Sequence, residues 1–369
     1  MSDKKAQIVA IIGQGYVGLP LAMAAVDAGW TVIGVDNFES KVAQINSGSS
    51  PVEDITDVQL QAALHSGAYF ATTDYSLVSK AFVITICVPT PLDEKRKPDL
   101  TLLRSAATAL APYVSNDTLV VSESTSYPGT LRNIILPIVN GSKPESSKTV
   151  YFASAPERVN PGDPVWNQKN TPRLVGAIDT ESQKKAMYFY QSICDAVVSV
   201  STPEVAEAAK LLENTFRLVN IALVNEFTQV CSKSGINVQE VIDAASSKPY
   251  GYMPFRPGVG VGGHCIPVDP MYLTWWARQN GEVASFVETA DSINHEMPKY
   301  CVEGLEALYG KLNGKHVLVV GVSYKPDISD TRESPAEFVI RELEKKGAKV
   351  SWHDPLVESF NGQSSASIA

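Results

Sequence analysis

The chain has 369 residues, 44% of them hydrophobic and 19% charged, which is enough for two or three domains with buried cores. Its 31 Lys and Arg against 40 Asp and Glu give a formal net charge of −9, which argues against nucleic acid as a partner. No apolar run of about 18 residues occurs, so we expect no membrane span.

The first half of the chain alternates strand-like and helix-like segments. The run 7–12 (QIVAII) is apolar and rich in β-branched residues, as a buried parallel strand should be. A glycine turn, a helical stretch to Ala28, a stop at Gly29 and a second run, TVIGVD, complete a βαβ unit. Further strand-like runs follow at 81–88, 118–122 and 149–154. This alternation predicts an α/β fold with a doubly wound parallel sheet.

The apolar stretch after Lys4 and Lys5 has some features of a signal peptide. Glycines interrupt it and no small-residue cleavage site follows, so a first β-strand is favoured. The cysteines are odd in number, widely spaced and in no metal-ligand pattern. We therefore expect no metal site and a reducing, cytoplasmic location.

The glycine turn reads Gly13-Gln14-Gly15-Tyr16-Val17-Gly18 and stands between the first strand and the first helix. This context indicates a dinucleotide site, because the helix N-terminus and the close backbone suit a pyrophosphate. Asp36, at the end of the second strand, is placed to accept from the ribose hydroxyls and would repel a 2′-phosphate, which favours NAD over NADP. A glycine-rich turn without a ligand is the alternative.

Beyond residue 201 the pattern becomes helical. Thr202 and Pro203 are typical of a helix start, and a periodic stretch runs to about Ser234, before Gly235. More helices are expected at 237–246, 270–280 and 283–309.

At Lys315 the strand–helix alternation returns, with a strand in HVLVVGV, a helix from about Pro335 to Lys346 and a strand in AKVSWHD. The final segment, SFNGQSSASIA, is small and polar and is expected to be disordered. We expect two Rossmann-like doubly wound domains joined by a central helical domain with one long helix. The domain boundaries predicted from these patterns are 1–200, 201–310 and 311–369, and we expect the last domain to be truncated.

Residues 254–270 read PFRPGVGVGGHCIPVDP and place Cys265 directly after a cluster of glycines. Backbone amides that approach a thiol can stabilise a thiolate or an oxyanion, so Cys265 is a candidate nucleophile. A buried, inert cysteine is an equally good interpretation of this residue alone. The other cysteines are expected to belong to the core: Cys87, Cys194, Cys231 and Cys301.

The long helix carries Lys210, Asn214 and Arg217 on one face. Glu207 and Glu213 could pair with the two cations, which would make this an ordinary solvated face. An amide in the middle of a helix argues mildly for a functional role instead.

Seven motifs in one order resemble the UDP-glucose/GDP-mannose dehydrogenase family, and the resemblance covers nearly the whole chain. They are IGQGYVGLPLA, CVPTPLD, ESTSYPGT, APERVNPGD, EAAKLLENTFR, GVGVGGHCIPVDP and GVSYKPDISDTRESPA. KPYGYMPF and GGHCIPVDP are most similar to the branch that oxidises UDP-N-acetylglucosamine, with the N-acetylmannosamine branch close behind.

The resemblance implies a four-electron oxidation of the sugar's C6 alcohol to a carboxylate with two NAD in turn, for surface polysaccharide synthesis. It assigns the nucleophile to Cys265, which would form a thiohemiacetal and then a thioester. Lys210 and Asn214 match the pair that stabilises the oxyanion, Asp269 and Thr125 match groups that position the water or take its proton, and Glu157 matches the acid/base carboxylate.

The resemblance also places the ligands. The NAD site would comprise Gly13, Gly15, Tyr16, Val17, Gly18, Asp36, Pro89, Thr90 and Thr125. The substrate site would comprise Glu157, Arg158, Lys210, Asn214, Tyr252, Arg256, Gly258, Gly262, Lys325 and Arg332, with the amides from Gly258 to Gly263 against the sugar nucleotide. Arg158, Tyr252 and Arg256 can equally be ordinary surface residues.

Two departures from the family pattern stand out. Family members continue for about fifty residues past this C-terminus, which leads us to expect an incomplete third domain. Ser126-Tyr127 replaces a more usual Val-Pro beside the cofactor loop.

The family forms homodimers through the long helix, so a homodimer is expected here, although the apolar side chains of 202–234 could bury within their own domain instead. Two alternatives to the proposed activity stay open. One is a two-electron dehydrogenase of the hydroxyacid type, which would not need Cys265. The other is a non-catalytic NAD-binding protein.

Overall fold

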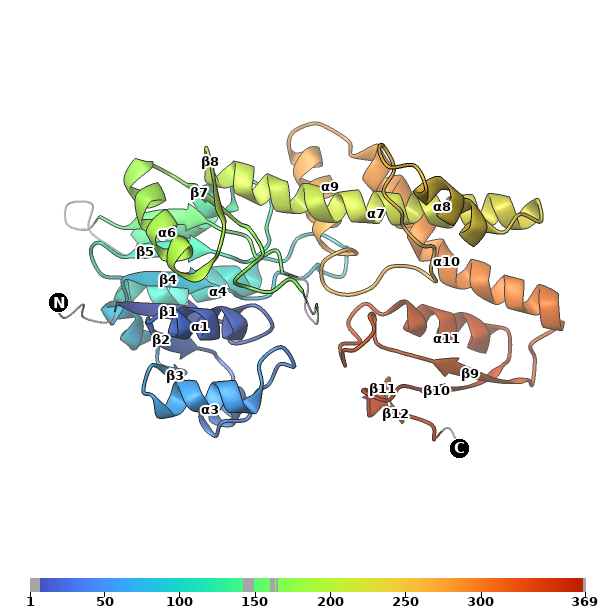
Figure 1. Cartoon of the computed structure of the whole chain (residues 1–369), viewed down its shortest axis with the longest axis horizontal. Coiled ribbons are helices and arrows are strands. Elements are labelled where there is room, and N and C mark those ends of the chain that lie inside the picture. Colours follow the sequence, from blue (N-terminus) through green and yellow to red (C-terminus); the bar gives the residue numbers. More distant parts are fainter. Residues whose placement is uncertain (1–6, 142–148, 160–162, 164, 368–369) are drawn as a thin grey trace. The chain divides into compact units, whose positions relative to one another are not determined.

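The structure, a computed structural model, describes residues 7–141, 149–159, 163 and 165–367. The chain divides into two compact units, Met1–Leu211 and Leu212–Ala369. Helix α7 (Pro203–Lys233), the long helix of Figure 1, contains the boundary between them.

The first unit contains an eight-stranded sheet with the strand order β3-β2-β1-β4-β5-β6-β7-β8 (Figure 1). Its strands are β1 (Ile8–Ile12), β2 (Thr31–Val35), β3 (Tyr69–Thr72), β4 (Val83–Ile86), β5 (Leu119–Ser122), β6 (Tyr151–Ser154), β7 (Arg173–Ala177) and β8 (Val197–Val200). The strands β1, β2, β4, β5 and β6 are almost entirely buried and pair in parallel, which confirms the expected doubly wound sheet.

Helices flank this sheet. They are α1 (Gly18–Asp27), α2 (Glu39–Asn46), α3 (Asp57–His65), η1 (Tyr75–Lys80), α4 (Thr101–Leu110), η2 (Ala111–Tyr113), η3 (Leu131–Ile135, a π-helical turn), α5 (Leu136–Gly141) and α6 (Thr180–Ile193). Leu19 of α1 and Phe189 of α6 share one hydrophobic core with Ile11 of β1. Ala10 and Ile12, which alternate with Ile11 along β1, are buried as well, so both faces of the sheet are covered.

The sheet is not parallel throughout, because β7 pairs antiparallel to β6. The described part of the connection 155–172 contains no helix. A parallel return would need a crossover, usually helical; the described part of this connection forms none, and the chain returns as an antiparallel neighbour.

The second unit begins within α7 and continues with α8 (Val238–Ser246), α9 (Asp269–Gln279) and α10 (Ser285–Tyr309). The predicted start of α7 is confirmed, since the Thr202 hydroxyl accepts a hydrogen bond from the Val205 N–H at 3.3 Å. Gly235 follows the helix with a φ of 68°, as a helix stop requires. Within the described ranges, none of the helices has the length and apolar character needed to cross a membrane.

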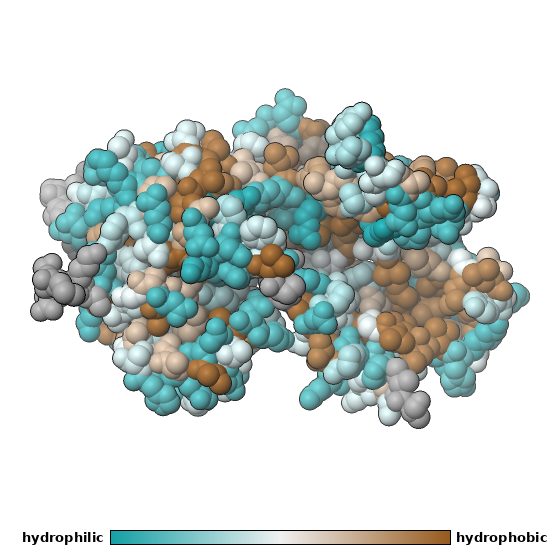
Figure 2. Space-filling view, viewed as in Figure 1, coloured by the Kyte–Doolittle hydropathy of each residue, from teal (hydrophilic) through white to brown (hydrophobic). Residues whose placement is uncertain are grey.

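The chain ends in a small α/β element of β9 (His316–Val320), α11 (Pro335–Lys345) and β10 (Lys349–His353), in which the two strands pair in parallel. Alternate residues of β9 are exposed, and Leu318 and Val320 are among them. Apolar side chains accordingly reach the surface over this region in Figure 2. In the described residues this sheet therefore has one covered face.

The prediction of a disordered tail is wrong for residues 359–367. Strands β11 (Ser359–Phe360) and β12 (Gln363–Ser364) form a hairpin, and the buried Phe360 ring lies 5.9 Å from that of Trp352. The turn residues Asn361 and Gly362 have φ values of 50° and 76°, which two-residue hairpins require. The Ala366 N–H also donates to the Trp352 carbonyl at 2.8 Å. Residues 368–369 lie outside the described part.

Candidate active site

The glycine turn after β1 has the geometry of a phosphate-binding turn. A Cβ on Gly13 (φ 93°) would lie 2.5 Å from the Cys87 carbonyl oxygen, and one on Gly18 only 1.8 Å from that of Gly13. The protein itself therefore requires glycine at these two positions. A Cβ on Gly15 would meet no protein atom within 4 Å, so open space lies beside the middle glycine, where a pyrophosphate would approach the backbone. The residues present thus fit a dinucleotide.

Asp36 ends β2 and is held in one orientation. Its carboxylate accepts from the N–H groups of Gln14 at 2.9 Å and Phe38 at 3.1 Å, and Lys41 binds it at 2.9 Å. Only 6% of Asp36 is exposed. A buried, fixed carboxylate at this point selects a ribose hydroxyl over a phosphate. Lys41 was not singled out from the sequence.

Substituting Asp36 with asparagine should weaken NAD recognition. We expect kcat/KM for NAD to fall by about 10- to 100-fold, since one charged hydrogen-bond acceptor is lost, and the NADP to NAD ratio of kcat/KM to rise. Steady-state kinetics with both cofactors measures this. Asp27→Asn, an exposed carboxylate at the end of α1, is the matched control. An unchanged ratio in Asp36→Asn would contradict the assignment.

The carboxyl ends of β4, β5 and β6 meet at one edge of the sheet and carry the expected cofactor and acid/base segments. The Ser124 hydroxyl accepts from the Val88 N–H at 3.0 Å and donates to the Val88 carbonyl at 2.7 Å. The Glu157 N–H donates to the Glu123 carbonyl at 3.3 Å. These bonds bring the segments of Thr90, Thr125 and Glu157 together.

The exposure of the residues in these segments differs. Thr90 is buried, Pro89 is exposed, and Tyr16, Val17, Thr125, Glu157 and Arg158 are half-buried. The Glu157 carboxylate accepts the Val159 N–H, and Arg158 donates to the Pro172 carbonyl at 2.8 Å.

A buried polar network that the sequence did not reveal lies beneath these segments. Arg173 of β7 donates to the Glu123 carboxylate at 3.1 Å and to Gln168 at 2.5 Å, and the Tyr190 hydroxyl of α6 donates to Glu123 at 2.5 Å. Glu123 and Arg173 are 1% and 2% exposed. Because each charge is compensated, the network fixes the backbone just before Thr125.

Cys265 differs from the other cysteines in its surroundings. It is exposed, four residues before the first residue of α9, and its carbonyl accepts the N–H groups of Asp269 at 2.9 Å and Val268 at 3.3 Å. Burial raises the pKa of the Cys87, Cys194 and Cys301 thiols. Cys87, Cys194 and Cys231 are buried as expected, whereas Cys301 is only half-buried.

The loop before Cys265 is closely packed against the residues after β9. A Cβ on Gly263 would lie 2.6 Å from the Tyr324 ring, and one on Gly262 would lie 2.8 Å from the Tyr324 Cβ. The Gly263 N–H donates to the Arg332 carbonyl at 3.0 Å. Tyr324, which the sequence did not single out, therefore explains why glycine is needed here.

A pair of buried amides anchors the other end of this loop. The Gly258 N–H donates to Asn225 of α7 at 2.9 Å, and Asn225 donates to Asn294 of α10 at 2.9 Å. The N–H groups of Gly258 and Gly263 are thus engaged within the protein. The expected amide contacts with a ligand would have to come from the residues between them, among them Gly262.

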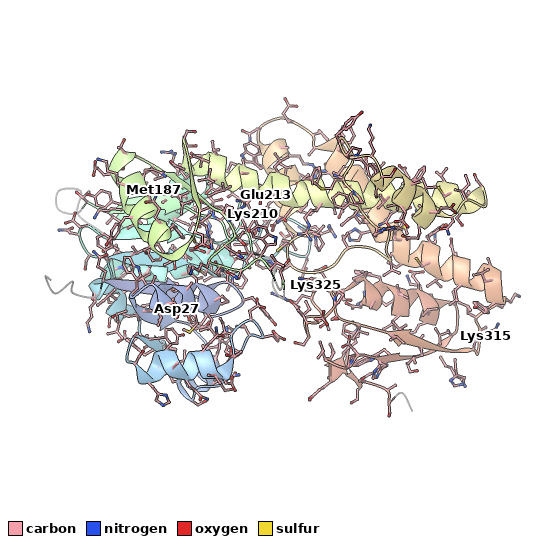
Figure 3. All side chains as sticks on the ribbon, viewed as in Figure 1. Asp27, Met187, Lys210, Glu213, Lys315 and Lys325 are labelled. Carbon is pink, nitrogen blue, oxygen red and sulfur yellow. The ribbon has the colours of Figure 1, made fainter. Side chains whose placement is uncertain are left out.

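Asn214 of α7 donates to the Asp269 carboxylate at 2.5 Å, and the two side chains are 4% and 1% exposed. Lys210, one turn earlier on α7 (Figure 3), is 5% exposed. The alternative of a solvated face is therefore wrong for Lys210 and Asn214. It holds only for Arg217, which is exposed.

The remaining expected substrate residues lie nearer the surface. Arg332 pairs with Asp330 at 2.5 Å and stays half exposed, and Lys325 is half-buried in the loop after β9 (Figure 3). Arg256 pairs with Asp243 of α8 at 2.5 Å, and Tyr252 is exposed. Among the described residues, no group of three or more His, Cys, Asp and Glu could hold a metal ion.

Comparison with protein families covers most of the chain. The NAD-binding domain of the UDP-glucose/GDP-mannose dehydrogenase family matches residues 7–194, its central domain 204–296 and its UDP-binding domain 318–367.

Individual relatives are similar over nearly the full chain. A UDP-N-acetyl-D-mannosamine dehydrogenase from Methanocaldococcus jannaschii is 37% identical, covering 95% of this chain and 80% of the relative. A UDP-N-acetyl-D-glucosamine 6-dehydrogenase from Pseudomonas aeruginosa is 34% identical, covering 97% and 84%. The solved structure of a UDP-N-acetylmannosamine dehydrogenase from Pyrococcus horikoshii superposes with a TM-score of 0.88 at 33% identity, covering 95% and 84%. The chain belongs to the UDP-glucose/GDP-mannose dehydrogenase family and is an NAD-dependent nucleotide-sugar 6-dehydrogenase, an oxidoreductase.

Proposed function

We propose that this enzyme oxidises the C6 alcohol of a UDP-N-acetylhexosamine to the carboxylate through a cysteine-bound intermediate, with UDP-N-acetylglucosamine as its substrate. The observation that carries the proposal is the exposed Cys265 in the turn that leads into α9, in the same unit as the buried Asn214–Asp269 pair. The sequences KPYGYMPF and GGHCIPVDP support the choice of sugar.

Each oxidation needs a hydride acceptor, and NAD supplies that chemistry when bound. Glu157 takes the proton of the C6 hydroxyl in the first oxidation, and Lys210 and Asn214 stabilise the negative charge on that oxygen. Asp36 and the turn from Gly13 to Gly18 bind and orient the dinucleotide.

Cys265 retains the reactive aldehyde. Its thiolate adds to the carbonyl carbon, and the oxygen takes up a proton to give a thiohemiacetal. Loss of a second hydride and of that proton leaves a thioester on Cys265. Thr125 positions a water and Asp269 takes its proton as it adds to the thioester carbon; the carbon–sulfur bond breaks, the thiolate is restored, and the acid gives its remaining proton to solvent and leaves as the carboxylate. Asn214 holds the Asp269 carboxylate in place for this step.

The substrate class is tested by steady-state kinetics with NAD and UDP-N-acetylglucosamine, UDP-N-acetylmannosamine and UDP-glucose in parallel. We expect the highest kcat/KM with UDP-N-acetylglucosamine. The name of the M. jannaschii relative favours UDP-N-acetylmannosamine as the second candidate. Turnover of a 2-hydroxyacid, or NAD binding without turnover of any of the sugars, would contradict the proposal.

We also propose that the enzyme is a homodimer formed through α7. Large apolar side chains stay exposed along this helix, with exposed fractions of 66% for Leu212, 45% for Phe216, 59% for Leu223 and 41% for Phe227. Exposed apolar side chains in such number on one helix are typical of a protein–protein interface.

Substituting Leu223 with glutamate should convert the dimer to a monomer, because a charge would replace an apolar contact inside the interface. Light scattering after size-exclusion chromatography measures the mass. Val58→Glu on α3, where the valine is 76% exposed, is the matched control and should leave the dimer intact. A Leu223→Glu variant of unchanged dimeric mass would contradict this interface.

For the domain organisation we propose an NAD-binding domain over 1–200, a central helical domain over 201–310 and a UDP-sugar-binding domain over 311–369.

The cysteine usage supports a cytoplasmic location. A uronic-acid sugar nucleotide is a precursor for surface polysaccharide, which we propose as the use of the product.

A further inference from the structure

Glu207 is a buried carboxylate of α7 to which the proposed mechanism gives no role. Only 2% of the residue is exposed. Its Oε2 accepts from the Gly129 N–H at 2.7 Å and its Oε1 from the Leu131 N–H at 3.0 Å. Both oxygens are therefore occupied by backbone donors from a segment 76 to 78 residues away in the sequence.

Leu131 is the first residue of η3 and Gly129 lies in the turn just before it, where N–H groups have no partner within the helix. Gly129 has a φ of 94°, so the backbone makes a sharp turn here before it enters the helical turn. Glu207 thus serves as a cap from another element. The contact ties the segment that follows Thr125 to the first turns of α7.

The two ends of this contact adjoin proposed catalytic residues. Thr125 lies four residues before Gly129, and Lys210 lies three residues after Glu207, so that Glu207 and Lys210 share one side of α7. A shift of the 129–131 backbone relative to α7 would alter the distance between Thr125 and Lys210. Errors of about 1 Å in such geometry cost about 10²-fold in rate.

We propose that Glu207 is a positioning residue for the oxidation: by binding the Gly129 and Leu131 N–H groups it fixes the Thr125 segment against the turn of α7 that carries Lys210. The inference rests on the proposed function, because it takes the roles of Thr125 and Lys210 from there.

The groups around Glu207 are few. Glu204 lies one turn earlier on α7 and pairs with Arg132 of η3 at 2.7 Å, and Tyr127 lies on the segment between Thr125 and Gly129. Burial raises the pKa of Glu207 to about 8, against the effect of the two N–H bonds; Glu204 adds to the increase and Arg132 opposes it.

The folded-state pKa of Glu207 is above the ordinary value for glutamate. The contribution of this group to the free energy of unfolding is therefore complete at pH values below that ordinary pKa, and it is lost as the pH rises through about 8. A glutamine at this position cannot ionise. The stability of the wild type relative to Glu207→Gln should therefore decrease between about pH 5 and pH 9. Thermal unfolding of both proteins across this range measures the difference.

The test compares Glu207→Gln and Glu207→Asp with Glu204→Gln, the matched control on the same helix. Above about pH 8, where Glu207 is ionised, both its oxygens accept N–H groups. A glutamine then offers one acceptor and turns an NH2 group toward the second N–H, so amide exchange at 129–131 measured at that pH should accelerate. With UDP-N-acetylglucosamine and NAD, kcat should fall by about 10- to 100-fold while KM for the sugar stays within about twofold. Glu207→Asp should recover part of kcat, and Glu204→Gln should match the wild type in both measurements.

Unchanged amide exchange at 129–131 in Glu207→Gln would overturn the proposal, as would faster exchange with unchanged kcat. If Glu207→Gln does not fold, Glu207→Asp decides by the same two readouts. Failure of the proposed function is seen separately, as absence of uronate formation by the wild type with every UDP-sugar. In that case amide exchange still decides whether Glu207 holds the segment.

Discussion

Replacing Cys265 with serine is expected to lower the rate of uronate formation by at least about 10³-fold, because the serine hydroxyl is not ionised at neutral pH and is a poor nucleophile without a base to activate it. Cys265 is exposed, whereas Cys231 of the same unit is buried and Cys301 is half-buried, so its substitution should leave the fold intact. Mass spectrometry of the product over time measures uronate directly.

Cys301→Ser is the matched control, since this half-buried thiol has a raised pKa and no place in the proposed reaction. We expect it to retain wild-type activity. A Cys265→Ser variant that makes uronate as fast as the wild type would contradict the covalent route. The two-electron dehydrogenase of the hydroxyacid type would then be the better account of the site.

Replacing Lys210 with methionine is expected to lower kcat by about 10²- to 10³-fold, the effect of removing a donor that stabilises a developing oxyanion. Lys210 is 5% exposed, so its charge acts where water does not screen it. Methionine fills a similar volume, which keeps α7 packed. Stopped-flow measurement of the first NADH formed reports on the step concerned.

Lys233→Met, at the exposed end of the same helix, serves as the control and should change neither kcat nor the unfolding temperature. If Lys210→Met lowered only the unfolding temperature and left kcat unchanged, Lys210 would be structural. The oxyanion would then need another donor.

The Rossmann-like part of the fold was predictable from local patterns. The strand–glycine turn–helix–strand unit over 7–36 carries its own signals, and the structure has β1, α1 and β2 within a few residues of the predicted bounds. The long helix was predictable for the same reason, since Thr202, Pro203 and Gly235 mark its ends. These features depend on residues close together in the chain.

In the C-terminal tail, the turn residues and the overall composition predict different structures. Asn361-Gly362 is a strong hairpin signal, but the surrounding small polar residues suggest disorder, and only the packing of Phe360 on Trp352 decides for the hairpin. The antiparallel pairing of β7 likewise depends on how the irregular segment before it folds.

The contacts that hold the candidate site are long-range and could not be predicted from one sequence. The alternative of a solvated face would pair Glu207 with a neighbouring cation on α7, whereas its carboxylate accepts N–H groups from η3 and the turn before it. Glu123 and Arg173 are 50 residues apart and carry no pattern that would pair them. Resemblance to family motifs identifies residues that contact ligands. Tertiary packing determines which other residues hold those ligand-contacting residues in position.

The central claim is the four-electron oxidation through Cys265, and the number of NADH formed per UDP-N-acetylglucosamine consumed by the wild type tests it most directly. Absorbance of NADH and chromatographic loss of the sugar nucleotide give the two quantities in one reaction. The account predicts two NADH for each sugar, with uronate as the product. One NADH for each sugar, with an aldehyde or ketone as the product, would contradict it.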